Sequence, residues 1–172
     1  MTTKTPAEPA RRAPLPPRWV IRTAWTAHRA IFAVTRGRFG LRRQTAKSWG
    51  MMRLTTVGRR SGTERKAILG YFEDGPNLVT MAMNGWGEPE PAWWLNLQAQ
   101  PDTTVELAGE VRAVHGRAAN PDERPRLWAR WAEYDGEENL ASWASRRPRE
   151  TAVVILEPRP EPQVGSAQSQ LP

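Results

Sequence analysis

The chain has 172 residues, of which 39% are hydrophobic, and a formal net charge of +7; this length suits one domain with a real core and would be cramped for two. It contains no cysteine and two histidines, which excludes disulfides, thiolate metal sites and a thiol nucleophile, so we expect no metal centre. The first residues lack the apolar segment of a secretory signal, and no segment reaches the length of a membrane span, so we expect a cytoplasmic protein.

The positive charge is concentrated in the first part of the chain. Residues 18–66 carry thirteen Lys or Arg against one acid, whereas residues 67–172 carry nine bases against sixteen acids. A basic half of this kind favours an anionic partner: nucleic acid, an anionic membrane surface or a phosphorylated small molecule.

Both ends of the chain differ from its middle. Residues 1–17 and 158–172 hold nine of the sixteen prolines and almost no large apolar residue, so we expect two disordered tails around a single domain at residues 18–157. This domain begins with a predicted basic amphipathic helix at residues 18–36, whose apolar positions recur at helical spacing. We favour docking of this helix on its own domain, and contact with an anionic membrane on the cytoplasmic face is the alternative.

A glycine-interrupted connector at residues 38–50 separates this helix from a series of predicted β-strands joined by short turns. Six strands with hairpin links indicate a mainly β fold with α-helical decorations, a small antiparallel barrel, in preference to a doubly wound sheet. The expected strands are residues 51–57, 67–73, 78–83, 103–107, 111–118 and 151–157.

Three short helices are expected between these strands. Residues 92–100 form the first, which ends before a proline. Asn120 and Glu123 have the spacing of a capping box and predict a second helix that runs to about residue 131 or 133. A third is expected at residues 137–145.

Catalytic templates are mostly absent from the sequence. It has no GxSxG, no HExxH and no phosphate-binding loop that ends in Gly-Lys-Ser/Thr. His28 lies on the apolar face of the predicted first helix and His115 within a strand hairpin, so a structural role is favoured for both. An enzyme with this sequence would take its reactivity from a cofactor.

The turn at residues 58–66, "GRRSGTERK", is a candidate anion site. Successive backbone N–H groups of a glycine-containing turn can form an anion nest, and arginine side chains suit bidentate phosphate contacts. The alternative is a solvated hairpin tip, which this stretch alone favours. The polar and basic side chains of the turn are Arg59, Arg60, Ser61, Thr63, Glu64, Arg65 and Lys66.

The second candidate cluster is the segment at residues 84–96, "NGWGEPEPAWWLN", in which tryptophans lie beside glycines. Planar side chains there could form the wall of a slot for a flat ring. Trp93 and Leu97 are four residues apart on a predicted helix, and core anchors are the favoured interpretation for both. Trp86, in the loop, is the better ligand candidate.

Together, the ordered motifs "LTTVGRRSGTER", "NGWGEPEPAWWLNLQAQP" and "VVILEP" resemble the deazaflavin-dependent nitroreductase family, also described as coenzyme F420-dependent quinone reductases. The resemblance covers about residues 51–158, and two ordered motifs at the right separation are more specific than either alone. The matching positions are Leu54, Thr55, Thr56, Gly58, Arg59, Ser61, Gly62 and Arg65 in the first motif, and Gly85, Pro91, Trp93, Asn96, Leu97, Ala99 and Pro101 in the second.

The resemblance implies a split β-barrel of the FMN-binding-like type that binds reduced coenzyme F420 and passes a hydride to a quinone or nitroaromatic acceptor. The turn would hold the coenzyme's phosphate and polyglutamate tail, and residues 82–86 would line its ring. Tyr134 would hydrogen-bond or protonate the acceptor, unless it is a surface tyrosine at a helix end. The implied coenzyme-binding residues are Gly58, Arg59, Arg60, Ser61, Gly62, Arg65, Lys66, Ala82, Met83, Asn84, Gly85, Trp86, Trp93 and Asn96.

Some positions depart from the family pattern: Ile68 stands where many members have proline, Met83 where a serine is frequent, and Asn84 where a lysine or another small-polar pattern is usual. They leave open a non-catalytic barrel that holds a deazaflavin, a flavin or haem, although FMN is less favoured than F420. Nucleic-acid binding ranks last, because no recognition-helix or RNP-like motif is present. The sequence leaves the physiological acceptor and the oligomeric state open.

Overall fold

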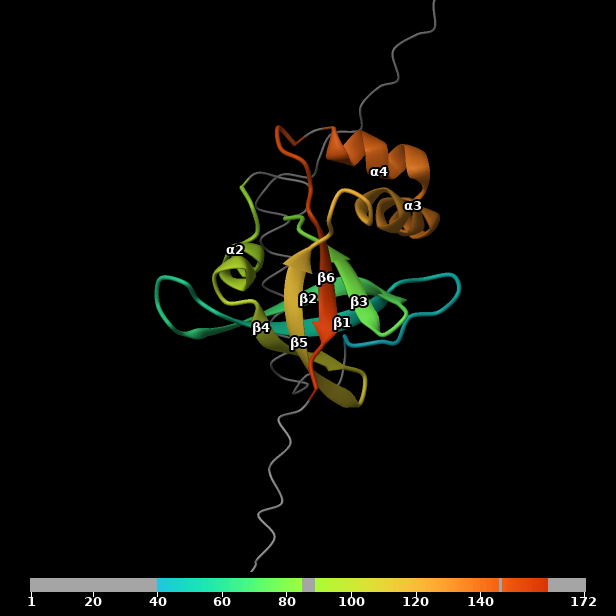
Figure 1. Cartoon of the computed structure of the whole chain (residues 1–172). Coiled ribbons are helices and arrows are strands. Elements are labelled where there is room, and N and C mark those ends of the chain that lie inside the picture. The colour runs from blue at the N-terminus through green and yellow to red at the C-terminus, as the bar shows by residue number, and fades with distance from the viewer. Residues whose placement is uncertain (1–39, 85–88, 146, 161–172) are drawn as a thin grey trace, which may run out of the picture. The chain divides into compact units, whose positions relative to one another are not determined.

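The computed structural model describes residues 40–84, 89–145 and 147–160 (Figure 1). Apart from the first of them, these residues belong to one compact unit, Leu41–Pro172. The predicted tail at residues 1–17, the predicted helix at 18–36, most of the C-terminal tail, and Gly85 and Trp86 lie outside the described residues. None of the described helices combines the length and apolarity that a membrane crossing requires.

Six antiparallel strands form a closed barrel with the spatial order β1-β2-β3-β6-β5-β4, which confirms the predicted fold class. The strands are β1 (Gly50–Val57), β2 (Glu64–Asp74), β3 (Asn77–Met81), β4 (Asp102–Leu107), β5 (Glu110–Ala118) and β6 (Val153–Pro158). The helices within the described residues are α2 (Ala92–Ala99), α3 (Arg124–Asp135) and α4 (Glu137–Ala144).

The largest differences from the expected elements are the starts of β2 and α3. Regular helix in α3 begins at Arg124, after the expected cap at Asn120. β2 begins three residues earlier than expected because β1 continues to Val57, which pairs with Glu64 directly beside the turn. The connector at residues 41–49 forms two isolated bridges, Arg42↔Met51 and Thr45↔Ser48, and no strand.

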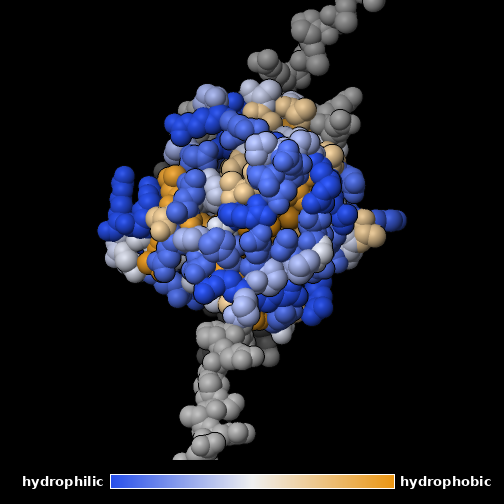
Figure 2. Space-filling view, viewed as in Figure 1, coloured by the Kyte–Doolittle hydropathy of each residue, from blue (hydrophilic) through white to orange (hydrophobic). Residues whose placement is uncertain are grey.

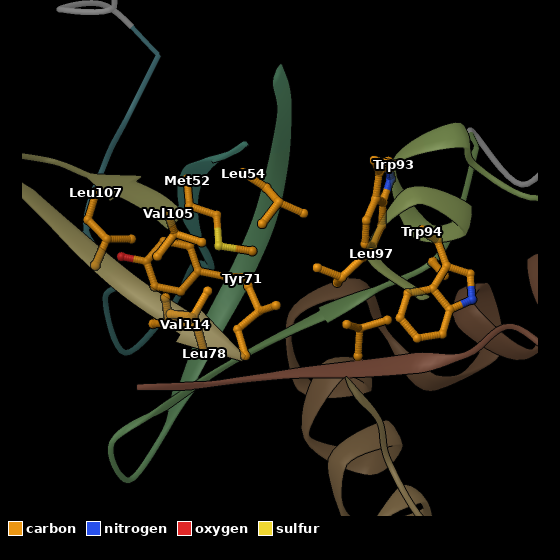
Figure 3. Close-up of a cluster of buried hydrophobic side chains, with 13 residues drawn as sticks. Met52, Leu54, Tyr71, Leu78, Trp93, Trp94, Leu97, Val105, Leu107 and Val114 are labelled. Carbon is orange, nitrogen blue, oxygen red and sulfur yellow. The ribbon is translucent and has the colours of Figure 1, made fainter. Parts of the chain in front are cut away.

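The barrel interior holds a cluster of apolar side chains from alternate strand positions (Figure 3). Helix α2 adds Trp93, Trp94 and Leu97 to this cluster, so the helix covers one end of the barrel. Leu97 is fully buried, and a Cβ on Gly116 of β5 would lie 2.5 Å from its Cδ2 atom. The close approach of α2 to the barrel therefore depends on a glycine in β5.

Helices α3 and α4 cover the outer face of β2, β3 and β6 (Figure 1). The strand residues in this second cluster are the sequence neighbours of residues that point inward: Phe72 follows the inward-facing Tyr71, and Val79 follows the inward-facing Leu78. Much of the rest of the surface seen in Figure 2 is hydrophilic. The helical side of the second cluster is Leu127, Trp131 and Leu140.

The predicted capping box is present at the start of α3. Asn120 Oδ1 accepts the amides of Asp122 (3.0 Å) and Glu123 (2.9 Å), and Glu123 Oε2 accepts the Asn120 amide (2.9 Å). Regular α-helix starts at Arg124, after this turn. Arg117 donates two hydrogen bonds to Glu123 and a third to Glu157, which attaches the turn to β5 and β6.

Replacement of Gly116 by alanine should lower the free energy of unfolding by about 1–3 kcal/mol, because the new methyl group overlaps Leu97 in a closed core. The matched control is Gly70→Ala in β2, where the nearest atom to a new Cβ is 3.5 Å away; we expect a change within about 0.5 kcal/mol. Urea unfolding of both variants makes the comparison. Equal effects would show that α2 does not approach β5 as described.

Acid should weaken the attachment of the α3 turn. The hydrogen bonds from Arg117, and then that from the Asn120 amide, lower the pKa of Glu123 from 4.5 to about 2. A lowered pKa in the folded state contributes stability that is present above pH 4.5 and is lost as the pH falls through about 2. The melting-temperature difference between wild type and Arg117→Gln should therefore shrink from pH 5 to pH 2. A difference that is constant over this range would contradict the assignment.

Candidate functional site

Two parts of the proposed coenzyme site are joined at one end of the barrel, which we call the hairpin end, and the third part, the end of β3, is directed toward it. The turn between β1 and β2 lies there because Val57 pairs with Glu64. β3 runs antiparallel to β2, with Phe72 paired to Val79, so β3 runs toward the same end. Helix α2 is attached to this end by Asn96, as described below. The barrel thus brings together the two motifs that the sequence separates.

The turn at residues 58–63 has a defined backbone. The Gly58 amide donates to the Thr63 carbonyl (2.8 Å), and the Gly62 amide donates to the Gly58 carbonyl (2.7 Å). Gly62 has a φ of 64°, which favours glycine. A Cβ on Gly58 would lie 2.7 Å from Ser61 Oγ. The backbone conformation therefore favours glycine at position 62, and the close Ser61 hydroxyl favours it at position 58.

The amides of this turn do not form the anion nest that the sequence suggests. The amides of Gly58, Ser61 and Gly62 donate to carbonyls of the turn, and the Thr63 amide donates to Ser61 Oγ. The Arg59 amide donates to Asn96 Oδ1. Because these five donors already have acceptors inside the protein, an anion at this turn would be bound mainly by side chains.

The turn presents four exposed cations, Arg59, Arg60, Arg65 and Lys66, and among the described residues only Lys66 forms an ion pair. Lys66 lies 3.0 Å from Glu64, and Arg59 Nη1 donates to Asn96 Oδ1. Within the described ranges, neither Arg60 nor Arg65 forms an ion pair. Elsewhere in the described residues, each of these arginines pairs with a carboxylate: Arg53, Arg112 and Arg117 on the strands, Arg126 on α3, and Arg147 after α4.

Asn96 joins the second motif to the first. Its side chain is buried, and Oδ1 accepts hydrogen bonds from the Arg59 amide (3.2 Å) and Arg59 Nη1 (3.4 Å). Its Nδ2 donates to Thr56 Oγ1 on β1 (3.4 Å). Both polar atoms of the side chain are thus used within the protein, and Asn96 positions the turn relative to α2.

The candidate ring residues differ in accessibility. Ala82 is buried, and its amide donates to the Ala152 carbonyl (2.9 Å). Met83 is half-buried against the second apolar cluster, and Asn84 is exposed. Trp93 is 9% exposed and belongs to the barrel core, as its interpretation as a core anchor requires.

Sequence reasoning missed Arg147, a buried arginine that contacts the end of β3. Its guanidinium is buried and donates to the Ala82 carbonyl (2.9 Å), Thr151 Oγ1 (2.7 Å) and Glu90 Oε1 (3.2 Å). In the sequence it stands within "SRRPRE", which looks like a solvated basic run. No periodicity distinguishes the buried arginine from its neighbours.

Tyr134 is not brought to the turn. It is half-buried near Trp49 and Phe72, with ring centroids 6.4 and 6.3 Å away, and its hydroxyl accepts a hydrogen bond from Gln44 Nε2 (2.7 Å). Phe72 lies eight residues along β2 from Glu64, about 26 Å at ~3.3 Å per residue. A role of Tyr134 toward the acceptor stays a prediction.

Comparison with known proteins identifies the family. A family model described as F420H(2)-dependent quinone reductase matches residues 25–158. The chain therefore belongs to the F420H(2)-dependent quinone reductase family. Membership makes it an F420-dependent oxidoreductase with coenzyme F420 as its cofactor, and a non-catalytic barrel is not favoured.

Two relatives from Mycobacterium tuberculosis carry the family's name. The first, whose name as an F420H(2)-dependent quinone reductase is provisional, is 36% identical over 106 residues, which are 59% of this chain and 83% of the relative. The second, named F420H(2)-dependent quinone reductase, is 29% identical over 131 residues, 75% of this chain and 86% of the relative.

Solved structures support the barrel. An F420-H2-dependent reductase superimposes with a TM-score of 0.55 at 24% identity, over 62% of this chain and 93% of that one. A structure described as a domain-swapped dimer gives 0.56 at 22% identity, over 79% of this chain and 99% of that one. At these identities the likeness shows the fold.

Removal of the Asn96 side-chain amide should detach the turn from α2. We expect Asn96→Ala to lower the free energy of unfolding by about 1–3 kcal/mol, because Thr56 and Arg59 each lose a hydrogen bond to the buried Asn96 side chain. Gln98→Ala, at an exposed position of the same helix, is the control and should change stability by less than about 0.5 kcal/mol. Urea unfolding that gives the same value for both would exclude Asn96 as the connection.

Proposed function

We propose that this chain transfers a hydride from reduced coenzyme F420 to a quinone, with the coenzyme bound at the hairpin end of the barrel. The observation that carries the proposal is the cationic turn, in which Arg60 and Arg65 have no ion pair among the described residues while Asn96 fixes the turn to α2. A nitroaromatic compound is an alternative acceptor of the same electron-poor kind.

The coenzyme's tail provides the anions that such a turn would bind. Guanidinium groups donate paired N–H bonds to phosphate and carboxylate oxygens, so Arg60 and Arg65 are the proposed principal contacts. Arg59 and Lys66 would add charge, although both already have protein partners. Ser61 would add a hydroxyl donor. The excess of positive charge in residues 18–66 would also attract an anionic coenzyme from solution.

The ring is proposed to lie against Ala82, Met83 and Asn84 at the end of β3, with Gly85 and Trp86 as further ring residues from the sequence. When bound, the reduced coenzyme supplies the hydride, and the protein orients the ring and excludes water. Tyr134 is kept as a proposed partner of the acceptor. Contact of the predicted helix at residues 18–36 with an anionic membrane belongs to this proposal, since a lipid-soluble quinone would be met there.

The double variant Arg60→Gln/Arg65→Gln should weaken coenzyme F420 binding by about tenfold or more, because two charge-assisted contacts are lost. The control removes the same charge elsewhere: Arg42→Gln/Arg43→Gln lies at the opposite end of β1, where Arg42 bridges Met51. Equilibrium titration monitored by coenzyme fluorescence at two salt concentrations gives both affinities. Binding by the wild type should weaken with salt.

Two results would contradict the proposal. If both double variants weaken coenzyme binding equally, the effect comes from the net charge of the protein, and the turn is not the binding site. Wild-type protein that binds the coenzyme and reduces no quinone in single-turnover absorbance measurements would remove quinones as the acceptor.

A further inference from the structure

We propose that Arg147 is a positioning residue for the coenzyme ring, which it places by fixing the end of β3 relative to the start of α2. This inference rests on the proposed function in one respect, namely that Ala82, Met83 and Asn84 line the ring. The structural observation is independent of it: one buried guanidinium joins the two ends of the connection between β3 and α2.

The contacts of Arg147 come from three parts of the chain. Its Nη1 donates both to the carbonyl of Ala82, directly after β3, and to Thr151 Oγ1, shortly before β6. Its Nη2 donates to Glu90 Oε1, two residues before α2, at 3.2 Å. The Arg147 side chain is 3% exposed and that of Glu90 is 15% exposed. The guanidinium therefore acts in a nearly water-free environment.

A buried charge makes these contacts obligatory. An arginine cation without its partners in such a place is strongly unfavourable, so the Ala82 carbonyl and the Glu90 carboxylate are held to the same planar group. The Ala82 amide is also fixed, because it donates to the Ala152 carbonyl. With both polar groups of Ala82 bound, the directions in which Met83 and Asn84 leave the strand are set by this network.

Lysine cannot reproduce this arrangement. Its single ammonium nitrogen has no planar fork, whereas the two Nη atoms of Arg147 contact acceptors on separate segments. Arg147→Lys retains the charge and loses the geometry. Small displacements of a bound ring have large effects on hydride transfer, since reacting atoms must approach closely.

Arg117 provides a matched control within the same barrel. It also makes several hydrogen bonds, to Glu123, Glu157 and the Ala118 carbonyl, and pairs with two carboxylates. Its partners belong to β5, the α3 turn and β6, and none of them belongs to the connection between β3 and α2. Arg117→Lys should therefore destabilise the barrel without displacing Ala82.

The test compares Arg147→Lys with Arg117→Lys and wild type. Three quantities are measured: the melting temperature, the dissociation constant for coenzyme F420, and the absorbance maximum of the bound coenzyme, which reports the surroundings of its ring. We expect both variants to melt at lower temperature. Arg147→Lys alone should raise the dissociation constant, by roughly tenfold, and shift the absorbance maximum.

Either of two results would overturn the inference while wild-type binding is intact: folded Arg147→Lys with wild-type affinity and absorbance, or equal changes in both variants. If Arg147→Lys does not fold, Thr151→Val and Glu90→Gln, which each alter one acceptor, are judged by the same two coenzyme readouts. Wild-type protein that does not bind the coenzyme would instead refute the proposed function, and the inference with it.

Discussion

The amide side chain of Asn96 connects the two halves of the candidate site. It accepts hydrogen bonds from Arg59 in the β1–β2 turn and donates to Thr56 on β1, while its own helix covers the hairpin end of the barrel. The turn therefore has a fixed position relative to α2. A cationic hairpin without such a connection would be a mobile surface feature, and its arginines would lose more conformational entropy on binding an anion.

The distribution of ion pairs separates structural arginines from candidate binding arginines. On the barrel wall and on α3, guanidinium groups such as those of Arg117 and Arg126 pair with carboxylates of other strands and turns. At the turn, Arg60 and Arg65 have no such partner among the described residues. An arginine that already has a carboxylate partner would lose that ion pair when it binds another anion. Exposed arginines without a partner have no such loss, so they are the better candidates for binding an anionic tail.

The sequence predicted the barrel well because its strands have strong local signals. Short turns link β1 to β2, β2 to β3 and β4 to β5, and the capping box of Asn120 and Glu123 marks the start of α3. The family motifs also predicted that the turn and α2 belong to one site. These features depend on residues that are close together in the chain, so they are visible as patterns in the sequence.

The features that could not be predicted depend on contacts between distant segments. The turn amides described above donate to acceptors inside the protein, one of them to Asn96, so the described turn does not have the anion nest that is one interpretation of its glycines. Arg147 is distinguished from its basic neighbours only by burial against Ala82 and Glu90. Tyr134 is held by Gln44 within an aromatic cluster, and nothing in the spacing of α3 indicates this partner.

The most direct test of the central claim is a crystal structure of the protein with coenzyme F420. The account predicts that the phosphate and carboxylates of the tail lie within hydrogen-bonding distance of the Arg60 and Arg65 guanidinium groups, with the ring against Ala82, Met83 and Asn84. A coenzyme whose tail contacts neither Arg60 nor Arg65, or whose ring lies away from Ala82, Met83 and Asn84, would contradict it.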